Sequence, residues 1–287
     1  MKNNDVPVQL VLTDNTTRAE EMYVNGLVDG LSSIYTNTIF QNSEGVNSKL
    51  VWIFDYSGAA DAILGPQNTT IADLKGKKIG LEGINTFSHI FVLQALAEEG
   101  LSENDVQFED ISGQGILEAL ESEQIDASHT WGPTKFAALQ NGYKVLATAE
   151  DVLGVITDVL IFNSRVVDSR PGDIQAIVNS INQGKEYLDS SREESSLLLS
   201  NYFNVSLQEV QDGFEGIQIL GLEDNVDAMN KSLDSGMTSL YHSGHVIAEY
   251  LLERGQIRQM PNFDEIIDPK FVNKIFEENG GGDVQDP

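Results

Sequence analysis

The segment that most constrains the fold is residues 49–64, Lys-Leu-Val-Trp-Ile-Phe-Asp-Tyr-Ser-Gly-Ala-Ala-Asp-Ala-Ile-Leu. The apolar run Leu50–Phe54 predicts a strand, the polar residues Asp55–Gly58 predict a turn, and Ala59–Leu64 predicts a second strand. In α/β proteins, ligands bind where strands end at such turns, because backbone N–H groups and short polar side chains are exposed there. The segment is therefore a candidate ligand-binding turn beside a buried strand.

Strand-like and helical segments alternate along the first half of the chain, which predicts an α/β fold with parallel sheets covered on both faces. The spacing of Ile90, Leu93 and Leu96 is typical of a helix. After Phe162 the pattern is helical almost to the end, with helix starts predicted at Pro171, at Ser206 and at Asp268-Pro269. The other predicted strands are Val8–Thr13, Asp29–Ser33, Lys78–Glu82, Val106–Asp110, Ala127–Trp131, Lys144–Thr148 and Thr157–Phe162.

Two connectors divide the chain. Residues 65–70 are rich in turn-forming residues, and Thr70 with Asp73 has the spacing of a helix cap. Residues 151–157 form the second connector. We expect lobe 1 to comprise residues 1–66 and 157–287, and lobe 2 to comprise residues 67–156. Two lobes joined by two crossings predict a hinge with a cleft.

The charge balance limits the partners. The chain has 45 acidic and 17 basic residues and a net charge of −28, so we expect no nucleic-acid partner, because nucleic acids bind basic surfaces. The acidic surface could keep the protein soluble in a salty environment, or its negative field could attract a cationic ligand. The net charge alone does not distinguish these two explanations. The absence of cysteine excludes disulfides and thiolate chemistry. We recognise no secretory signal at the start and no apolar run of membrane-spanning length.

Three constellations could line the cleft. The first is Tyr56-Ser57-Gly58, flanked by Asp55 and Asp61. The second, residues 82–89, predicts either a seat for an anionic or polar ligand group at a helix start or a plain turn capped by Asn85 or Thr86. The third, residues 126–133, ends a strand in Trp131, which either stacks on a ligand or closes the core.

The sequence contains few of the residue patterns that are typical of an enzyme's active site. The four histidines are scattered, and no Ser-His-Asp order or metal triad is evident. His242 and His245 lie three residues apart on a predicted helix, a spacing that is more common on a solvated helix face. We therefore expect no catalytic residues, no metal and no cofactor.

The chain resembles the extracytoplasmic solute-binding proteins of nitrate, sulfonate, taurine and thiamine-pyrimidine import systems, the NMT1-like or sulfonate-binding family. The resemblance runs in order and spacing from about residue 6 to 275. It rests on Val28–Gly30, Asp55–Ala62, Ala72–Gly80, Gln124–Ala127 with Thr130-Trp131, Asp158–Ile161, Ser239–Ser243, Ile247–Glu249, Asp268-Pro269 and Phe271-Val272. It implies a two-lobed periplasmic-binding-protein fold of type II. By position, the family's cleft residues correspond to Ser32, Ser33, Tyr56, Ser57, Asn85, Thr86, Ser88, Thr130, Trp131 and Asp158.

One departure from the family concerns the first lobe. Family members begin with a further strand and helix, and that strand is central in the first lobe, whereas this chain starts near the second strand, at Val8–Leu12. We expect a lobe without this strand to expose unpaired backbone and apolar surface.

The residues leave two ligand classes open. Sulfonate or nitrate would need converging cationic or N–H donors, and the candidate cleft offers only Lys135 and the helix start at residues 85–88. Tyr56 and Trp131 with Asp55 and Asp158 favour a flat, neutral or cationic molecule such as a pyrimidine or an amine. Asp158 could equally cap a turn.

The resemblance implies a monomeric solute-binding protein that captures a small molecule between its lobes and delivers it to an ABC transporter permease, on the periplasmic or extracellular face of the membrane. An alternative is the ligand-sensing outer domain of a membrane receptor. Pyrimidine-synthesis relatives use a cysteine cluster, and this chain has no cysteine, so that activity is not expected.

Overall fold

A computed structural model describes residue 4 and residues 6–13, 16–84, 86–232 and 236–281. The chain folds into two compact units. Unit 1 lies within Met1–Asp55, Thr157–Gln211 and Ile219–Pro287, and unit 2 comprises Tyr56–Ile156 and Asp212–Gln218. The second boundary falls after Ile156, and residues 212–218, which the expected division assigned to lobe 1, also belong to unit 2. The first falls after Asp55 instead of after residue 66, because the strand at residues 62–65 belongs to the sheet of unit 2.

Unit 1 is built on a four-stranded sheet with the order β1-β8-β2-β9. Its strands are β1 (Gly30–Ile34), β2 (Ser48–Ser57), β8 (Thr157–Asn163) and β9 (Ile217–Ile219), and the last residues of β2 and the first of β9 are assigned to unit 2. β1 and β8 run antiparallel. The run from Leu50 to Ile53 in β2 is buried on both faces of the sheet, as a continuous apolar strand should be.

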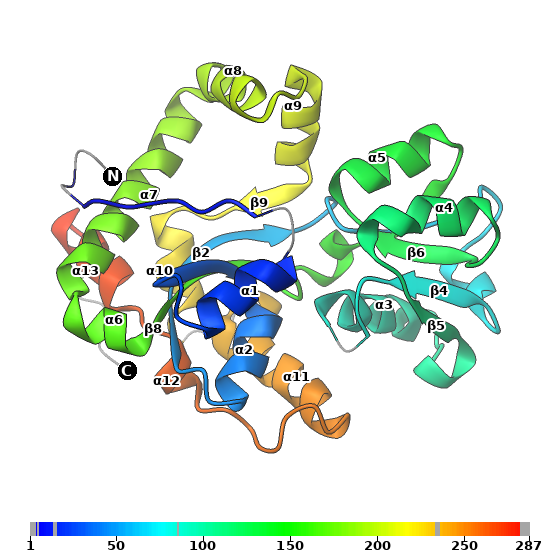
Figure 1. The fold of residues 1–287 in the computed structure, drawn as a ribbon, viewed down its shortest axis with the longest axis horizontal. Coiled ribbons are helices and arrows are strands. Elements are labelled where there is room, and N and C mark those ends of the chain that lie inside the picture. Colours follow the sequence, from blue (N-terminus) through cyan, green and yellow to red (C-terminus); the bar gives the residue numbers. More distant parts are fainter. Residues whose placement is uncertain (1–3, 5, 14–15, 85, 233–235, 282–287) are drawn as a thin grey trace. The chain divides into compact units, whose positions relative to one another are not determined.

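Helices supply most of unit 1 (Figure 1). They are α1 (Thr16–Val24), α2 (Tyr35–Ser43), α6 (Ser164–Ser169), α7 (Pro171–Ser190), α8 (Arg192–Phe203), α9 (Leu207–Glu215), α10 (Leu222–Ala228), α11 (Leu240–Glu253), α12 (Phe263–Ile266), α13 (Lys270–Glu278) and the 3-10 turn η6 (Gly236–Thr238). The helix starts predicted at Pro171 and Ser206 are confirmed. Ser206 and Glu209 form the predicted capping pair, with the Ser206 backbone N–H and side-chain hydroxyl both donating to Glu209 at 2.7 Å.

Unit 2 has a five-stranded sheet with the order β5-β4-β6-β3-β7. Its strands are β3 (Ala62–Gly65), β4 (Lys78–Leu81), β5 (Gln107–Asp110), β6 (Ala127–Thr130) and β7 (Lys144–Thr148). The helices are α3 (Phe87–Glu98), α4 (Ile116–Glu121) and α5 (Gly132–Gln140), with 3-10 turns η2 (Ile71–Leu74), η3 (Glu103–Asp105), η4 (Gly113–Gly115) and η5 (Ala149–Val152). The predicted cap at Thr70 is present, because its backbone N–H donates to Asp73 at 2.9 Å.

Four sequence-based expectations are wrong in detail. Val8–Thr13 belongs to no sheet. The polar residues Asp55–Ser57 continue β2 instead of forming a turn, and the turn lies at residues 58–61, so the strand predicted over Ala59–Leu64 begins only at Ala62. The sheets are mixed, since β3 pairs antiparallel with both β6 and β7 while β4 pairs parallel with β5 and β6. The short strand β9 was not predicted, because three residues between helices carry too little pattern.

Candidate functional site

In unit 2, three strands end at one edge of the sheet. β4 runs parallel to both β5 and β6, so the carboxyl ends of these three strands meet. Asp110 ends β5 and accepts a hydrogen bond from the backbone N–H of Gly83 at 3.2 Å, while Trp131 follows β6. Ligand sites of α/β proteins occur at such edges, so this edge is the candidate site in unit 2.

Two glycines shape the turns at this edge. Gly83 has φ +87° and Gly132 has φ +49°, both in the left-handed region that side chains disfavour. A Cβ at Gly83 would lie 2.6 Å from the Thr86 methyl carbon. The hydroxyl of Thr86 donates to the Gly83 carbonyl at 2.8 Å instead of capping α3. These turns lead each strand directly into a helix, α3 after β4 and α5 after β6.

A chain of buried polar side chains lies beneath the edge. His129 Nε2 lies 2.8 Å from Asp61 Oδ1, and His129 Nδ1 lies 2.7 Å from the Ser88 hydroxyl. The hydroxyl of Ser57 donates to the other oxygen of Asp61. All four residues are at most 7% exposed. A buried carboxylate needs such partners, so the chain links the turn after β2 to α3 and β6.

Aromatic rings surround His129. The centroid of Trp131 lies 5.4 Å from that of His129 and 5.8 Å from that of Phe87. Phe91 contacts the imidazole edge-on at 5.3 Å. Trp131 is only half-buried, so it presents aromatic surface to solvent while its inner side is fixed by the buried network. A partly exposed, immobilised indole can stack on a flat ligand.

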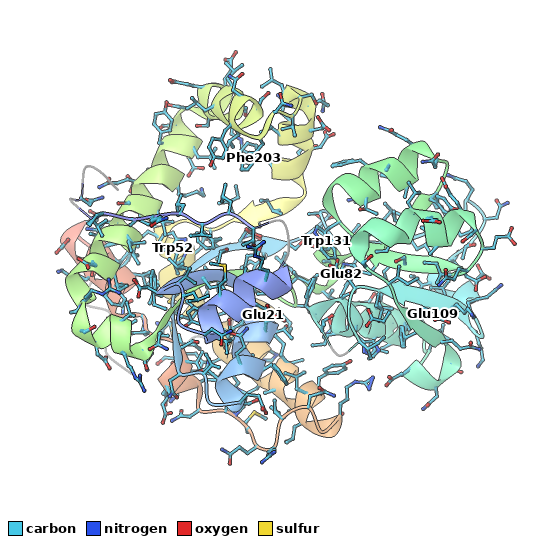
Figure 2. All side chains as sticks on the ribbon, in the orientation of Figure 1. Glu21, Trp52, Glu82, Glu109, Trp131 and Phe203 are labelled. Atoms are coloured by element: carbon cyan, nitrogen blue, oxygen red, sulfur yellow. The ribbon has the colours of Figure 1, made fainter. Side chains whose placement is uncertain are left out.

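Two charged groups at the edge have shifted pKa values. Burial raises the pKa of Glu82, nearby Asp110 adds to the rise, and His129 opposes it. Burial lowers the pKa of Lys135, and the charge of Asp61 opposes that shift. Lys135 donates to the carbonyl of Ala59, which holds its ammonium group in the turn after β2. Figure 2 labels Glu82 and Trp131, whose side chains both lie near His129.

The predicted site residues fall into two groups. Tyr56, Ser57, Thr86, Ser88, Thr130 and Trp131 belong to unit 2, and Ser32, Ser33 and Asp158 belong to unit 1. Asn85 lies outside the described residues. Within unit 2, Trp131 and Thr86 are partly exposed, whereas the other four residues are at most 5% exposed. Trp131 and Thr86 thus present surface to solvent, while the other four residues of this group are buried.

In unit 1 the candidates lie on the paired strands β1 and β8. Ser32 is exposed, Ser33 is 7% exposed and Asp158 is half-buried. Asp158 pairs with Ile34 across the two strands, next to the Ser33–Val159 pair. The strands therefore bring Ser33 and Asp158 close together, while Ser32 points to the opposite face.

Sequence reasoning missed the role of His129. It treated the histidines as scattered, yet His129 joins Asp61 and Ser88. The available signal was its position inside a predicted strand, two residues before Trp131, since a buried imidazole needs hydrogen-bond partners. The three residues include the components of a hydrolytic triad, but Ser88 has no exposed surface, and a nucleophile must reach its substrate.

Among the residues that the structure describes, two kinds of feature are absent. No group of three His, Asp or Glu side chains among them could hold a metal ion. None of their helices is long and apolar enough to span a membrane.

Parts of this chain are similar in sequence to known proteins. An aliphatic sulfonates-binding protein of Escherichia coli is 28% identical over 166 residues, which are 56% of this chain and 51% of that protein. A binding protein of Brucella abortus is 26% identical over 154 residues, or 52% of this chain and 48% of that protein. The chain thus spans about half the length of the curated relatives it matches.

Solved structures share the fold. The periplasmic aliphatic sulphonate binding protein SsuA of Escherichia coli matches with a TM-score of 0.68 at 20% identity, over 85% of this chain and 80% of that chain. The desulfurization enzyme DSZB matches with a TM-score of 0.64 at 16% identity, over 87% of this chain and 85% of that chain. The chain therefore has the fold of the periplasmic binding proteins.

A family model covers more than half of the sequence. The model described as NMT1/THI5-like matches residues 2–195, which include all of the described candidate site residues in both units. The chain belongs to the NMT1/THI5-like family.

Proposed function

We propose that this chain is a solute-binding protein of an ABC-type import system. The observation that carries the proposal is Trp131, a half-exposed indole held by buried His129 at the carboxyl edge of a parallel sheet. Relatives whose names describe binding proteins support it. The edge offers an aromatic surface, a carboxyl group and an amine, which are groups that hold a small polar molecule.

The residues around Trp131 favour a flat, neutral or cationic ligand. Residues 56–156 contain no arginine, the side chain best suited to a bidentate grip on an anion. Lys135 is occupied by the Ala59 carbonyl, and Glu82 adds a carboxyl group. An aliphatic sulfonate, named for one of the relatives, is the competing ligand class. An indole face attracts cations and stacks on rings, which favours a pyrimidine or an amine.

A thermal-shift screen tests the proposal. The panel contains pyrimidines, amines, aliphatic sulfonates, nitrate and small carboxylates. A ligand present at 100 times its Kd should stabilise the protein by about 2.7 kcal/mol, which raises Tm. Stabilisation by sulfonates alone would reverse the ligand preference, and no shift with any compound would contradict the binding function.

Tryptophan fluorescence locates the ligand. The chain has two tryptophans, and Trp52 is 1% exposed in the core of unit 1, so a stacking ligand should quench mainly Trp131. Trp131→Phe should remove most of the quenching, and Trp131→Ala should abolish the thermal shift. Tyr202→Ala, at an aromatic residue that is 67% exposed on α8, is the matched control and should leave both signals unchanged. An unchanged shift in Trp131→Ala would remove Trp131 from the site.

We further propose that the protein leaves its ligand chemically unchanged. The buried position of Ser88 supports this, whereas the shared fold of DSZB is compatible with an enzyme. Mass spectrometry of the best ligand after prolonged incubation should return it intact. A converted product that disappears in Ser88→Ala would identify an enzyme instead.

The setting of the protein is also a proposal. We propose a periplasmic or extracellular location, which the names of structural relatives support, and a permease partner and a monomeric state, which the resemblance implies. Capture of the ligand between two closing lobes stays a prediction, which small-angle scattering tests through a smaller radius of gyration with ligand. Loss of ligand uptake in cells lacking this chain would support the transport role, and normal uptake would contradict it.

A further inference from the structure

The carboxyl group of Glu82 lies at the candidate site of unit 2 without a partner. Glu82 follows β4 directly and is half-buried, and its backbone carbonyl accepts a hydrogen bond from Thr86 at 3.2 Å. Within the part of the chain that the structure describes, no N–H, O–H or amino group bonds to its side-chain oxygens. A carboxylate that loses part of its hydration without gaining a partner is destabilised, so the side chain of Glu82 is available to a ligand.

The charges nearest to Glu82 do not compensate its own. Burial raises the pKa of Glu82, His129 opposes the rise, and the carboxylate of Asp110 adds to it. Both nitrogens of His129 already face other partners, Asp61 and Ser88. The ionised form of Glu82 therefore needs a positive charge that its surroundings do not supply.

The lysines of unit 2 are engaged elsewhere. Three of them lie before β4 or at its start, at the opposite end from Glu82, and pair with acidic side chains at 3.0–3.1 Å, namely Lys75 with Asp105, Lys77 with Asp126 and Lys78 with Glu109. Lys144 begins β7, and Lys135 donates to the carbonyl of Ala59. Unit 2 contains no arginine. A cation beside Glu82 would therefore come from a ligand.

Glu82 lies close enough to Trp131 for one small molecule to contact both. β4 and β6 are neighbours, with Gly80 opposite Ser128. Two residues further along this register, Glu82 lies beside Thr130, the residue before Trp131 (Figure 2). Neighbouring strands are about 4.8 Å apart, which is within the span of a small ring with one substituent.

A second set of contacts holds Glu82 at this edge. A Cβ at Gly113 would lie 2.8 Å from Oε2 of Glu82, so the carboxyl group lies directly against the backbone of η4. The carbonyl of Gly113 in turn accepts a hydrogen bond from the hydroxyl of Thr134, in the first turn of α5, at 3.2 Å. The turn after β5 thus connects Glu82 with the helix that follows Trp131.

The two side chains suit a particular kind of cation. A guanidinium or amidinium group is flat and weakly hydrated, so its face stacks on an indole. Its two parallel N–H groups match the two oxygens of a carboxylate. A compact ammonium group is more strongly hydrated and lacks the flat face, a neutral ring leaves the charge of Glu82 uncompensated, and a sulfonate is repelled by it.

We propose that Glu82 and Trp131 select a ligand with a guanidinium or amidinium group. The carboxylate of Glu82 accepts the paired N–H groups, and the indole of Trp131 stacks on the flat part of the molecule. This inference rests on the proposed solute-binding function and narrows its ligand class to planar cations. Glu82 is then the residue that sets the charge preference of the site.

Four compounds that share a phenyl ring test the proposal on the full chain by isothermal titration calorimetry. They are benzamidine, which is a planar cation, benzamide, which is its neutral counterpart, benzylamine and benzenesulfonate. Because a hydrogen bond between charged groups is stronger than one to a neutral group, benzamidine should bind at least about tenfold more tightly than benzamide. Benzylamine should lie between them, and benzenesulfonate should bind most weakly.

Three variants assign the preference to Glu82. Glu82→Gln keeps the size of the side chain and removes its charge, so benzamidine and benzamide should bind with similar affinity. Glu82→Asp keeps the charge and should keep part of the preference. Glu98→Gln, at an exposed position in the last turn of α3, is the matched control and should behave like the unchanged protein. Circular dichroism checks that each variant keeps the fold.

The pH dependence separates a charge effect from a structural one. The ordinary pKa of Glu82 is 4.5 and burial raises it, so Glu82 is ionised at pH 8 and largely protonated at pH 4. Benzamidine stays charged over this range, and its affinity should fall at least about threefold on acidification. His129 and Asp110 also titrate near Glu82, and the profile of Glu82→Gln measures their share. That profile should be flatter than the profile of the unchanged protein.

The outcomes distinguish this inference from the solute-binding function. Equal affinities for benzamidine and benzamide would overturn the inference and leave the binding function in place. A preference for benzamidine that persists in Glu82→Gln would also overturn it, because another residue would then set the preference. If none of the four compounds binds while a compound of the thermal-shift panel does, the inference alone fails. If nothing in either set binds, both proposals fail.

Discussion

His129 connects three separate pieces of unit 2 through two ring nitrogens and a set of aromatic contacts. Its Nε2 faces Asp61, its Nδ1 faces Ser88, and its ring supports Trp131. An ionised Asp61 can only accept hydrogen bonds, so Nε2–H donates to it. The other ring nitrogen, Nδ1, shares a hydrogen bond with the Ser88 hydroxyl. One imidazole thus fixes both the turn after β2 and the candidate stacking surface.

Replacing His129 should be costly. His129→Ala leaves the buried Asp61 carboxylate and the Ser88 hydroxyl short of a partner and should lower the unfolding free energy by about 3–5 kcal/mol. Urea denaturation followed by Trp131 fluorescence measures this, because the indole lies 5.4 Å from the replaced ring. His242→Ala, at an exposed position on α11, is the control and should change the unfolding free energy by less than about 0.5 kcal/mol. Equal effects of the two variants would contradict the structural role of His129.

Tyr23 predicts a loss of stability at high pH. Its hydroxyl donates to Ser48 at 2.8 Å, and burial raises its pKa to about 12 from the ordinary value of 10.0. The folded state therefore keeps a proton that the unfolded state loses above pH 10. The contribution of the neutral phenol to stability is complete below pH 10 and falls by about 1.4 kcal/mol per pH unit toward pH 12.

The control for this pH effect is Tyr23→Phe, which has no titrating hydroxyl. Urea denaturation at several pH values between 9 and 11.5 should show a shallower decline for the variant. Parallel pH profiles for the two proteins would show that Tyr23 is not responsible.

The sequence located candidate residues at strand ends and turns, but it did not reveal their hydrogen-bond partners. Trp131 and Thr86 were recognisable because strand ends and turns are local patterns. The pairing of Asp61 with His129 joins positions 68 residues apart, and it depends on the antiparallel pairing of β3 with β6. A local pattern does not carry that register, so the buried network could not be predicted.

At the scale of elements, α10 completes the sheet of unit 1 with a side chain. The backbone N–H of Ile53 donates to Asn225 Oδ1 at 2.7 Å, and Asn225 Nδ2 donates back to the Ile53 carbonyl at 3.0 Å. Asn225 is fully buried. Its amide takes the place of a neighbouring strand at this point of β2, close to β9, where Leu220 donates to the Phe54 carbonyl at 2.9 Å.

Asn225→Ala should therefore destabilise unit 1. It leaves two buried backbone groups of Ile53 without partners and should lower the unfolding free energy by about 2–4 kcal/mol. The Trp52 signal in urea denaturation reports the change, since Trp52 precedes Ile53 in the core. Asn141→Ala, at an exposed helix end in unit 2, is the control. A loss of less than about 1 kcal/mol would mean that water replaces the amide.

Most elements were predictable from sequence and a few were not. β7 has its predicted bounds, and β4, β5, β6 and β8 lie within a residue of theirs, because compact apolar runs bounded by turns specify strands well. Val8–Thr13 has the same kind of run and forms no strand. A strand needs a neighbour as well as a pattern, and among the described residues no strand pairs with this segment.

At the scale of the whole molecule, charge is the dominant property. The net charge of −28 is distributed over 287 residues, and the ion pairs among the described residues lie mostly at exposed positions. Exposed pairs contribute little stability, so they do not offset the mutual repulsion of the carboxylates. Salt shortens the range of that repulsion to about 3 Å at 1 M.

Added salt should therefore stabilise the folded chain. Between about 0.05 M and 1 M NaCl we expect Tm to rise by several degrees, measured by differential scanning calorimetry. Potassium chloride should act like sodium chloride, because screening depends on ionic strength. A Tm that falls or stays constant with salt would show that repulsion between the carboxylates does not lower the stability of the folded chain.

The interleaved order of the strands in unit 1 has a consequence for biosynthesis. β2 ends at Ser57, yet its neighbour β8 begins only at Thr157, whereas every strand of the unit 2 sheet lies between Ala62 and Thr148. Translation of the roughly 100 intervening residues takes about 5–20 s at usual speeds. During that time unit 2 can form its sheet on the ribosome. The apolar residues Leu50–Ile53 of β2 stay unpaired until β8 has been synthesised. The emerging chain is therefore most vulnerable to aggregation in this interval, and chaperones would be needed most before residue 163 has left the exit tunnel.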